Sequence, residues 1–444
     1  MTSAYFQTLS LQSVPDLLWL HAQNPSKYPQ LLATTAGALD HPGYDILFAC
    51  PQEHIEVQYP GGFLERLDQA WHSARVGNQS TDLPFYGGWF VYLGYELAAE
   101  IEPELTLPSA RDGLPIALAV RIPAAIIIDK QQQQAYLVCE NDYLHCREDI
   151  LADLERPVDV SMYQQPVRVT DMEEDDEQAY LDQVLRIKEY IVEGDIFQAN
   201  LSRAWSASLD TNCNDASLFW HLFQANPGPF NALISLGEQS VVSSSPERLV
   251  SVDMGMVQTR PIAGTRPRSK NLEQDQALSS ELMGHPKERA EHIMLIDLER
   301  NDLGRICVPG SVEVNELMVL ESYQHVHHIV SNVRGQLRSN VSPGDVIRAV
   351  FPGGTITGCP KIRCMEILAE LEQVGRGAYT GSLGYLNRDG NMDLNILIRT
   401  LVRDGHQLRF RAGGGIVADS DPHKELLETR AKAKGLVMAL TGNS

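Results

Sequence analysis

Short apolar runs separated by proline and glycine dominate the first third of the chain. Residues 44–51, 87–97 and 118–129 are rich in β-branched and aromatic side chains, and turn-forming residues bound each run, which is typical of strands. A different period follows, because apolar residues recur every three or four positions over residues 180–191 and the pattern stops at Gly194. The pattern predicts strands in the first part of the chain and an amphipathic helix near its middle.

The segment between these two patterns has the composition of a domain boundary. Residues 156–177 combine prolines and polar residues with an acidic run. We therefore expect a first domain over residues 1–165 and a second over residues 175–440. Further strands and helices follow without the alternating rhythm of βαβ units, so the sequence predicts an α+β protein with antiparallel sheets.

Two glycine-rich segments could bind an anion. Residues 351–372 run from a glycine-rich loop into an amphipathic helix that Pro360 starts, and backbone N–H groups at such a start attract anions. The expected apolar face of this helix consists of Ile362, Met365, Leu368 and Leu371. Because the loop lacks the Gly-Lys-Ser/Thr ending of a P-loop, a small carboxylate fits better than a nucleotide phosphate. The second segment, residues 413–415, either aims further N–H groups at the same ligand or forms a tight turn.

A tyrosine and an arginine stand between the two glycine-rich segments. Residues 378–386 and 393–402 are both strand-like, and they contain Tyr379 and Arg399. These two side chains could form a pair of donors for a carboxylate. An arginine among apolar neighbours is either paired structurally or holds an anion, and the adjacent segments favour the anion.

Two pairs of acids, each with a spacing of three, repeat in the C-terminal third: Glu288 and Glu291, and Glu425 and Glu428. A proline stands at a plausible first helical position before each pair, so one interpretation is that the acids complement a helix dipole. The other interpretation is that the two pairs face each other. They would then form an all-oxygen cage, which suits Mg²⁺ shared with an anionic substrate.

Composition narrows the classes of partner. The 444 residues include 36 basic and 58 acidic side chains, and the net charge of −22 argues against nucleic acid or an anionic membrane. We find no apolar run long enough to span a bilayer and no signal-peptide pattern, so the cytoplasm is the expected location. Seven scattered cysteines without a C-x-x-C motif predict neither disulfides nor a zinc knuckle. Zinc at His325, His327 and His328 is also disfavoured, because no thiolate stands nearby.

Nine ordered blocks resemble the chorismate-utilising enzymes, and the resemblance covers residues 180–440. The blocks are SSSPERLV, TRPIAGTRPR, ERAEHIMLIDLERNDLGR, VHHIVS, PGGTITGCPKIRCMEI, AYTGSLGY, NILIRT, AGGGIVADSDP and ELLETRAKA. Residues 31–51 and 83–97 are also similar to the first domain of the amino-transferring members. The resemblance implies an α+β fold in which two antiparallel sheets pack face to face with helices outside. It also implies chorismate as substrate and Mg²⁺ as cofactor.

The resemblance further implies a role for each matching residue. Glu247 matches the general acid that protonates the departing C4 hydroxyl, so its carboxyl must stay protonated near neutral pH. His328 and Thr265 match residues at the ring, and Glu291 and Glu428 match direct Mg²⁺ ligands with Glu288 and Glu425 beside them. The implied substrate-binding set is Gly264, Thr355, Tyr379, Arg399, Gly413, Gly414, Gly415 and Lys432.

The nucleophile is also partly implied by the resemblance. Members that add water have a lysine as general base in the block GDIFQANLSR, and this chain has Gln198 there. A glutamine cannot deprotonate water, whereas ammonia attacks as the free base without such help. Ammonia would come from a separate glutamine amidotransferase subunit, since nothing in the sequence resembles a glutaminase nucleophile.

The matching segments differ in which carbon of chorismate they imply is aminated. Ala263 replaces the lysine found in many members that aminate C4, which favours amination at C2. The segments at residues 31–35, 44–51 and 351–361 instead resemble aminodeoxychorismate synthase component I more than anthranilate synthase component I. The sequence therefore predicts amination at C4, giving 4-amino-4-deoxychorismate for 4-aminobenzoate and folate synthesis. The alternatives are amination at C2 with pyruvate elimination, giving anthranilate for tryptophan synthesis, and a non-catalytic regulator that binds chorismate or tryptophan.

Overall fold

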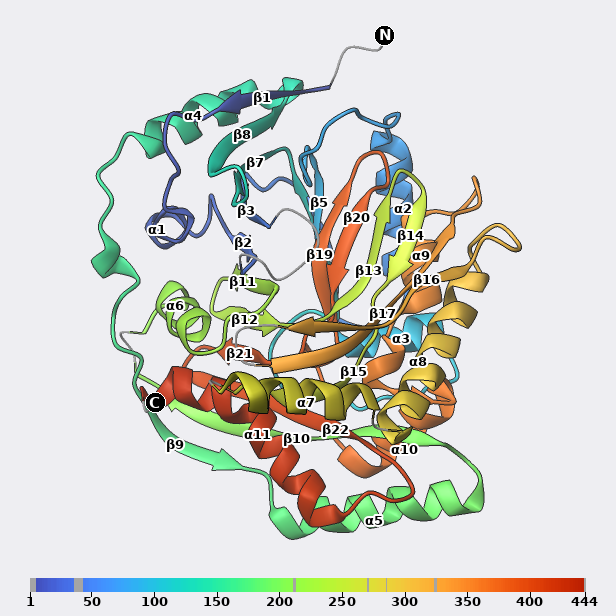
Figure 1. Ribbon diagram of the computed structural model, residues 1–444. Coiled ribbons are helices and arrows are strands. Elements are labelled where there is room, and N and C mark those ends of the chain that lie inside the picture. Colours follow the sequence, from blue (N-terminus) through green and yellow to red (C-terminus); the bar gives the residue numbers. More distant parts are fainter. Residues whose placement is uncertain are drawn as a thin grey trace.

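The computed structural model describes residues 5–35, 43–210, 213–269, 271–284, 286–322 and 326–442. Within these residues, two antiparallel sheets contain the strands (Figure 1). The 12-stranded sheet A has the order β1 (Phe6–Ser10), β8 (Gln134–Glu140), β7 (Ala124–Asp129), β3 (Tyr44–Ala49), β2 (Gln30–Ala33), β11 (Phe230–Leu236), β12 (Gln239–Ser245), β21 (Thr400–Asp404), β22 (Gln407–Ile416), β10 (Gln198–Leu209) and β18 (Gly358–Cys359), with β9 (Val169–Glu174) beside β10. The 10-stranded sheet B has the order β15 (Ile262–Pro267), β17 (Val326–Gln336), β14 (Met256–Thr259), β13 (Arg248–Asp253), β20 (Met392–Asn395), β19 (Ser382–Asn387), β5 (Gly88–Leu93), β6 (Ala117–Ile122) and β4 (His54–Val57), with β16 (Glu313–Ser322) beside β17.

The two sheets pack face to face around a shared apolar layer. Side chains alternate between the faces of each strand, so in β3 Ile46 and Phe48 point between the sheets while Leu47 and Ala49 join the outer core. Phe90 of sheet B meets Phe48 with ring centroids 5.5 Å apart. The predicted α+β architecture with face-to-face antiparallel sheets is therefore confirmed.

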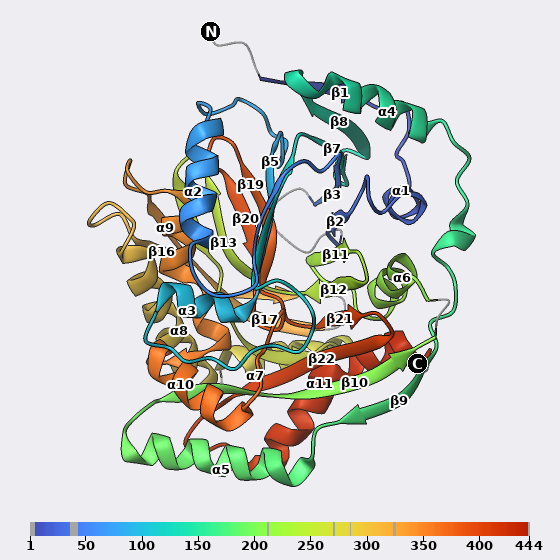
Figure 2. The same cartoon turned by 180° about the vertical axis from the view of Figure 1, so that it is seen from behind.

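Helices cover the outer faces of both sheets (Figures 1 and 2). Sheet A carries α1 (Leu17–Gln23), α4 (Leu144–Leu154), α6 (Asp215–Ala225) and α11 (Pro422–Thr441). Sheet B carries α2 (Phe63–Ala74), α8 (Pro286–Gly304) and α9 (Pro343–Val350). The remaining helices are α3 (Ala98–Ile101), α5 (Glu177–Glu193), α7 (Leu272–Gly284), α10 (Lys361–Glu372), η1 (Tyr95–Leu97), η2 (Asn141–Tyr143), η3 (Val160–Met162) and η4 (Gly354–Ile356). Of these, α5 and α10 pack against β10 at the end of sheet A that carries the glycine-rich segments.

The sequence pattern predicts several of these elements well. Helix α5 begins after Asp176, whose carboxylate accepts the N–H of Ala179, and it ends at Gly194, where a φ of 86° favours glycine. Helix α10 differs from the prediction in one respect. Ile362 is 43% exposed, and Cys364 and Ile367 complete the buried face instead.

Both sheets contain strands from either side of the predicted boundary. Leu31 of β2 lies opposite Leu233 of β11, and Phe90 of β5 lies opposite Tyr385 of β19. The segment at residues 165–175 therefore does not separate one sheet from the other. The division into domains at residues 1–165 and 175–440 stays a prediction.

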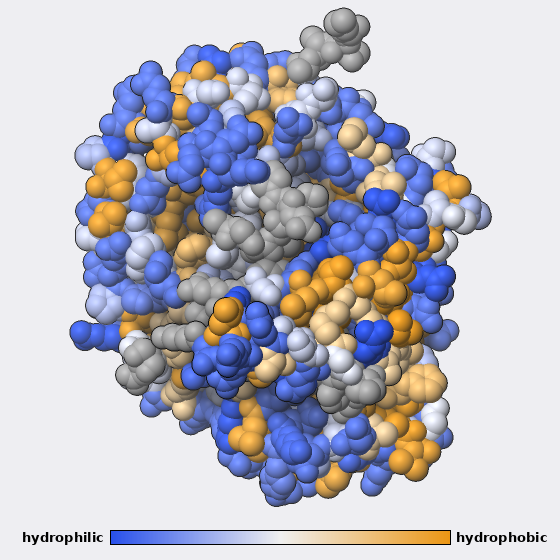
Figure 3. Space-filling view, in the orientation of Figure 1, coloured by the Kyte–Doolittle hydropathy of each residue, from blue (hydrophilic) through white to orange (hydrophobic). Residues whose placement is uncertain are grey.

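The surface is mixed in polarity. Hydrophobic side chains gather on the face that carries β16 and α8 (Figure 3), where Ile293, Leu317 and Leu320 are exposed. None of the helices within the described residues is both long and apolar enough to cross a membrane.

Candidate active site

The centre of the candidate site is the edge of β22 at the three glycines. The strand pairs with β10 from Gln407 to Ile416, but its other neighbour, β21, reaches only as far as Phe410. The glycines are therefore part of a strand, and the predicted alternative of a tight turn is wrong. The carbonyl of Gly413 accepts a hydrogen bond from Lys432 Nζ at 2.9 Å on the open edge. Because the N–H and C=O of one residue point the same way in an antiparallel strand, the N–H groups of Gly413 and Gly415 face this edge too.

Arg399 lies where β21 would otherwise continue beside the glycines. The expected strand over residues 393–402 is interrupted, since β20 ends at Asn395 and β21 begins at Thr400. Arg399 takes a φ of 52°. Its guanidinium forms no hydrogen bond or ion pair with any residue that the structure describes, and burial lowers its pKa although the charge of Glu247 opposes this. A half-buried guanidinium without a partner among the described residues is suited to an anionic ligand.

Tyr379 lies over one face of β22, at Gly413. It precedes β19 in a turn, and its hydroxyl lies against the α-carbon of Gly413, where a methyl group would stand 2.8 Å away. Only glycine leaves room for this approach. Burial raises the pKa of Tyr379 to about 12, so the hydroxyl is a neutral donor near pH 7. The predicted pair of donors, Tyr379 and Arg399, is thus placed around the glycines.

Acidic side chains of α11 lie above Gly414. Helix α11 begins at Pro422, as predicted, and a methyl group at Gly414 would be 3.4 Å from Glu428 Oε1, 3.5 Å from Glu425 Oε2 and 3.6 Å from Lys432 Nζ. Lys432 also pairs with Glu428 at 2.8 Å. The missing side chain of Gly414 therefore leaves a small hollow that is lined by carboxylates, a donor set that suits Mg²⁺.

Of the second pair of acids, Glu288 and Glu291, the structure describes only the side chain of Glu291. The side chain of Glu288 lies outside the described part of the structure, as does that of Thr265. Glu291 lies on α8 and is half-buried. Among the described side chains, no three His, Cys, Asp or Glu residues stand close enough to hold a metal, so Glu291 does not form a group of three with Glu425 and Glu428. The closed cage of four acids stays a prediction.

Glu247 is a buried acid at the start of β13. It is 6% exposed, and burial raises its pKa to about 7 although Thr355, the N–H of Ile262 and the charges of Lys432 and Arg399 act in the opposite direction. Glu247 Oε1 and Thr355 Oγ1 are both buried without a hydrogen-bond partner among the described residues. A carboxyl group that is partly protonated near pH 7 can donate a proton, and the role of Glu247 as the general acid stays a prediction.

A bulge in β15 positions His328. Gly264 forms the bulge with a φ of 66°, and His328 Nδ1 lies 3.4 Å from its carbonyl oxygen. Burial lowers the pKa of His328 to about 4, and the charge of Arg399 acts in the same direction. The imidazole is therefore neutral at pH 7. His327 points elsewhere, with its Nε2 3.1 Å from Asp275 Oδ1, and His325 lies outside the described residues.

Two amides of β10 also lie at this site. The Gln198 side chain lies directly against the α-carbon of Gly415, and its Oε1 atom is buried without a hydrogen-bond partner among the described residues. Asn200 Oδ1 is likewise buried without a hydrogen-bond partner among the described residues. The Asn200 Nδ2 group donates to the Thr355 carbonyl at 3.3 Å. Buried acceptors without donors are expected where a ligand supplies the donor.

One buried acid was missed in the sequence. Glu299 of α8 is 7% exposed, and its Oε1 atom would be 3.5 Å from a methyl group at Gly354. Burial raises its pKa to about 8, and the charges of Asp302 and Glu247 act in the same direction. Its spacing of eight residues from Glu291 places both acids on one helical face, and this was the available signal.

The fold and this site define a family. A sequence profile described as chorismate binding enzyme matches residues 29–438, and the chain therefore belongs to the chorismate binding enzymes. An anthranilate synthase component I-like protein of a Synechocystis species is 46% identical over 385 residues, which are 86% of this chain and 78% of that protein. Aminodeoxychorismate synthase component 1 of Bacillus subtilis is 48% identical over 264 residues, or 60% of this chain and 56% of that protein. The crystal structure of anthranilate synthase component I from Streptococcus pneumoniae superposes with a TM-score of 0.80 and 30% identity, covering 90% of this chain and 92% of that one.

Proposed function

We propose that this chain aminates chorismate at C4 with ammonia and Mg²⁺, giving 4-amino-4-deoxychorismate, as an aminodeoxychorismate synthase component I. The observation that carries the proposal is the buried acid Glu247, with a pKa raised to about 7, near the guanidinium of Arg399, which has no partner among the described residues. A proton donor beside a carboxylate-binding cation fits a dianionic substrate that loses a hydroxyl group. Net charge alone would repel that substrate, so these local cations are needed.

Different side chains of the site would bind different parts of the substrate. Tyr379, Arg399 and the N–H groups at the open edge of β22 would hold the enolpyruvyl carboxylate, and Lys432 would add positive charge there. Glu247 would protonate the C4 hydroxyl, which leaves as water while ammonia adds to the ring and then loses a proton. The neutral His328 and the bulge at Gly264 would line the ring, and Thr265 follows them on β15.

Magnesium would be held by the acids above Gly414. The hollow between Glu425 and Glu428 has suitable donors, and Glu288 and Glu291 would complete the set from α8. When bound, the ion would neutralise the ring carboxylate of chorismate and orient it.

Gln198 supports ammonia rather than water as the nucleophile. Its side chain lies against Gly415 and offers a carbonyl oxygen without a partner among the described residues, but no basic group. Ammonia can donate to such an oxygen and attack through its lone pair, whereas water would need a base. A separate glutamine amidotransferase subunit would supply the ammonia.

The segment at residues 31–35 supports the choice of C4 over C2. Anthranilate synthases commonly have an LLES-type element for tryptophan there. In this chain the Thr34 hydroxyl donates to the Tyr44 carbonyl at 3.1 Å, and the Thr35 hydroxyl donates to the Gly228 carbonyl at 2.7 Å. Both hydroxyl groups are therefore used within the protein. Ala263 favours the alternative, anthranilate synthase component I, which aminates C2 and eliminates pyruvate.

A product assay separates these reactions. We expect the purified chain, incubated with chorismate, Mg²⁺ and ammonium at alkaline pH, to form an amine that yields 4-aminobenzoate only after an aminodeoxychorismate lyase is added. Mass spectrometry before and after addition of the lyase is the measurement. A matched incubation without ammonium should form no product, because Gln198 provides no base for water.

Other products would contradict the proposal in distinct ways. Anthranilate formed without the lyase would show that the residue at position 263 decides the carbon. A hydroxylated isomer of chorismate in the incubation without ammonium would show that water is the nucleophile. Chorismate binding without turnover under any condition would favour the non-catalytic regulator.

A further inference from the structure

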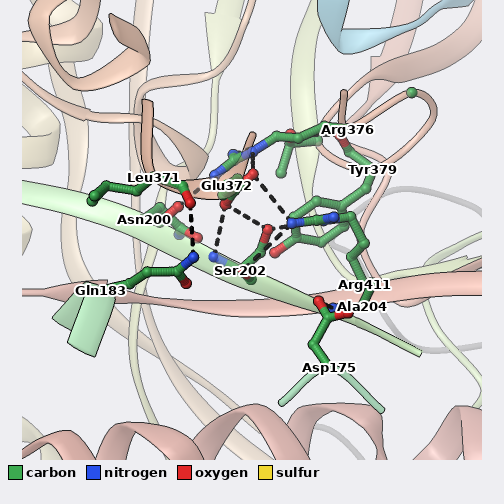
Figure 4. A network of polar contacts seen from close by, with 12 residues as sticks. Asp175, Gln183, Asn200, Ser202, Ala204, Leu371, Glu372, Arg376, Tyr379 and Arg411 are labelled. Carbon is green, nitrogen blue, oxygen red and sulfur yellow. Dashed lines mark hydrogen bonds and ion pairs between the residues drawn. The ribbon is translucent and has the colours of Figure 1, made fainter. Parts of the chain in front are cut away.

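A buried cluster of charges lies behind Tyr379 and has no role in the proposed chemistry so far. At its centre is Glu372, the last residue of α10 (Figure 4). Its carboxylate accepts hydrogen bonds from Arg376 Nη2 at 2.7 Å and Arg376 Nε at 2.9 Å, and from the backbone N–H and hydroxyl of Ser202 at 2.9 and 2.8 Å. Arg411 of β22 completes the cluster, 3.2 Å from Glu372 and 3.0 Å from the Ser202 hydroxyl.

The cluster contains two guanidinium groups and one firmly ionised carboxylate. Burial alone would raise the pKa of Glu372, but Arg376 and Arg411 outweigh it and lower the pKa below the usual value. Arg376 is 5% exposed and Arg411 is 9% exposed. Glu96 accepts the backbone N–H of Arg376, not its guanidinium, at 2.7 Å, and burial raises the pKa of Glu96 to about 7. Glu372, Arg376 and Arg411 together therefore carry one positive charge in excess, while Asp112, Glu173, Glu174 and Asp175 line the adjoining cavity.

Arg376 contacts Tyr379, and Arg411 lies on the same strand as Gly413. The Tyr379 N–H donates to the Arg376 carbonyl at 3.0 Å, and the Arg376 guanidinium lies between the rings of Tyr95 and Tyr379, 5.0 and 5.7 Å from their centroids. Arg411 precedes Gly413 by two residues on β22, and its partner Ser202 lies opposite Gly413 in the sheet. Figure 4 shows Arg411 beside the Tyr379 ring.

A neighbouring arginine provides a contrast. Arg409 lies on the same strand, and it lines with Arg411, Arg376 and Tyr379 a cavity of about 370 Å³. It donates to the Arg111 carbonyl at 2.6 Å, and its charge lowers the pKa of the buried Asp112, which burial otherwise raises. Arg409 therefore lies near Arg111 and Asp112, and no hydrogen bond or ion pair joins it to Glu372 or Ser202 among the described residues.

We propose that Arg376 and Arg411, held by their shared counter-ion Glu372, are positioning residues that fix Tyr379 and Gly413 and supply the surplus positive charge that attracts the substrate's side-chain carboxylate. The inference rests on the proposed function, because it takes this carboxylate to lie at Tyr379. The substrate carboxylate would neutralise this excess positive charge. Without substrate, the uncompensated charge destabilises the folded protein.

Two aromatic ligands test this role without any turnover. The first, 3-(1-carboxyvinyloxy)benzoate, has the ring carboxylate and side-chain carboxylate of the substrate. The second, 3-isopropenyloxybenzoate, replaces only the side-chain carboxylate by a methyl group. The ratio of their dissociation constants, measured by calorimetry with Mg²⁺ present, reports the contribution of that one carboxylate. A residue that only stabilises the fold would change both constants alike and leave the ratio unchanged.

We expect Arg411→Met to lower the preference for the dicarboxylate about tenfold, as for the loss of one charge-assisted interaction. Arg409→Met, the matched control, should leave the preference unchanged. Arg411→Gln also removes the charge but retains an amide donor for Glu372, and it replaces Arg411→Met if that variant does not fold. Arg411→Lys, which keeps the charge, should restore most of the preference.

The outcomes separate this inference from the proposed function. An unchanged preference in both Arg411→Met and Arg411→Gln would overturn the inference, while the unaltered chain still binds the dicarboxylate. An equal loss in Arg409→Met would also overturn it, because any nearby positive charge would then suffice. If the unaltered chain binds neither ligand and consumes no chorismate, the proposed function itself fails.

Discussion

Glu247→Gln is expected to lower the rate of chorismate turnover by about 10²–10⁴-fold, the usual contribution of a general acid. The amide keeps the size of the carboxyl group but cannot release a proton to the C4 hydroxyl. Chorismate binding should persist, because Tyr379, Arg399 and the β22 edge are unaltered. Turnover is measured by product formation, and binding by calorimetry. Glu238→Gln, in the exposed turn between β11 and β12, removes one carboxylate without entering the site and is the matched control.

The pH dependence gives a second readout of the same residue. The pKa of Glu247 is raised to about 7, so the required protonated form is complete below this pH and is lost above it. We expect kcat to be level at lower pH and to fall about tenfold per pH unit well above pH 7. The concentration of free ammonia must be held constant, because deprotonation of ammonium would otherwise raise the rate with pH. A kcat that is unaffected by Glu247→Gln, or a profile without this alkaline limb, would contradict the role of Glu247 as the acid.

Much of the fold was predictable because local and long-range preferences agree. The apolar period of α5, its cap at Asp176 and its stop at Gly194 all specify the same helix. The apolar run at residues 393–402 shows where this agreement fails. Its composition favours one strand, but the chain turns at Arg399, whose carbonyl accepts the Ser244 N–H at 3.1 Å. That contact joins residues far apart in the sequence, and no local pattern reports it.

The residues of the candidate site that lie in family-like sequence blocks could be predicted from the sequence. Tyr379, Arg399 and the three glycines are in blocks that resemble the family, and the structure brings them together at one strand edge. The cluster behind them was not recognised, since Glu372 ends an amphipathic helix and looks like a solvent-exposed acid in the sequence. Only the fold places it against Ser202, 170 residues away. Glu299 was missed for the same reason, because burial and neighbouring charges, rather than residue type, give it an unusual pKa.

Glu428→Ala is expected to lower turnover roughly a hundredfold or more at any Mg²⁺ concentration, because a ligand to the proposed metal would be lost from the hollow above Gly414. Glu366→Ala is the matched control, since Glu366 is an exposed acid whose one ion pair among the described residues is with Arg363 of its own helix, at 2.9 Å.

The Glu428→Ala variant should also show a change in pH dependence that simple unfolding would not produce. Lys432 now pairs with Glu428 at 2.8 Å, and its charge already lowers the pKa of Glu247. Without Glu428 that effect is no longer offset, so the alkaline limb of the residual activity should move to lower pH. Turnover is measured over a Mg²⁺ titration at several pH values. Near-normal rates in Glu428→Ala, or recovery to the parent rate at high Mg²⁺, would remove Glu428 from the metal site. The same titration on Glu425→Ala then shows whether the hollow above Gly414 binds the ion through the other acid alone.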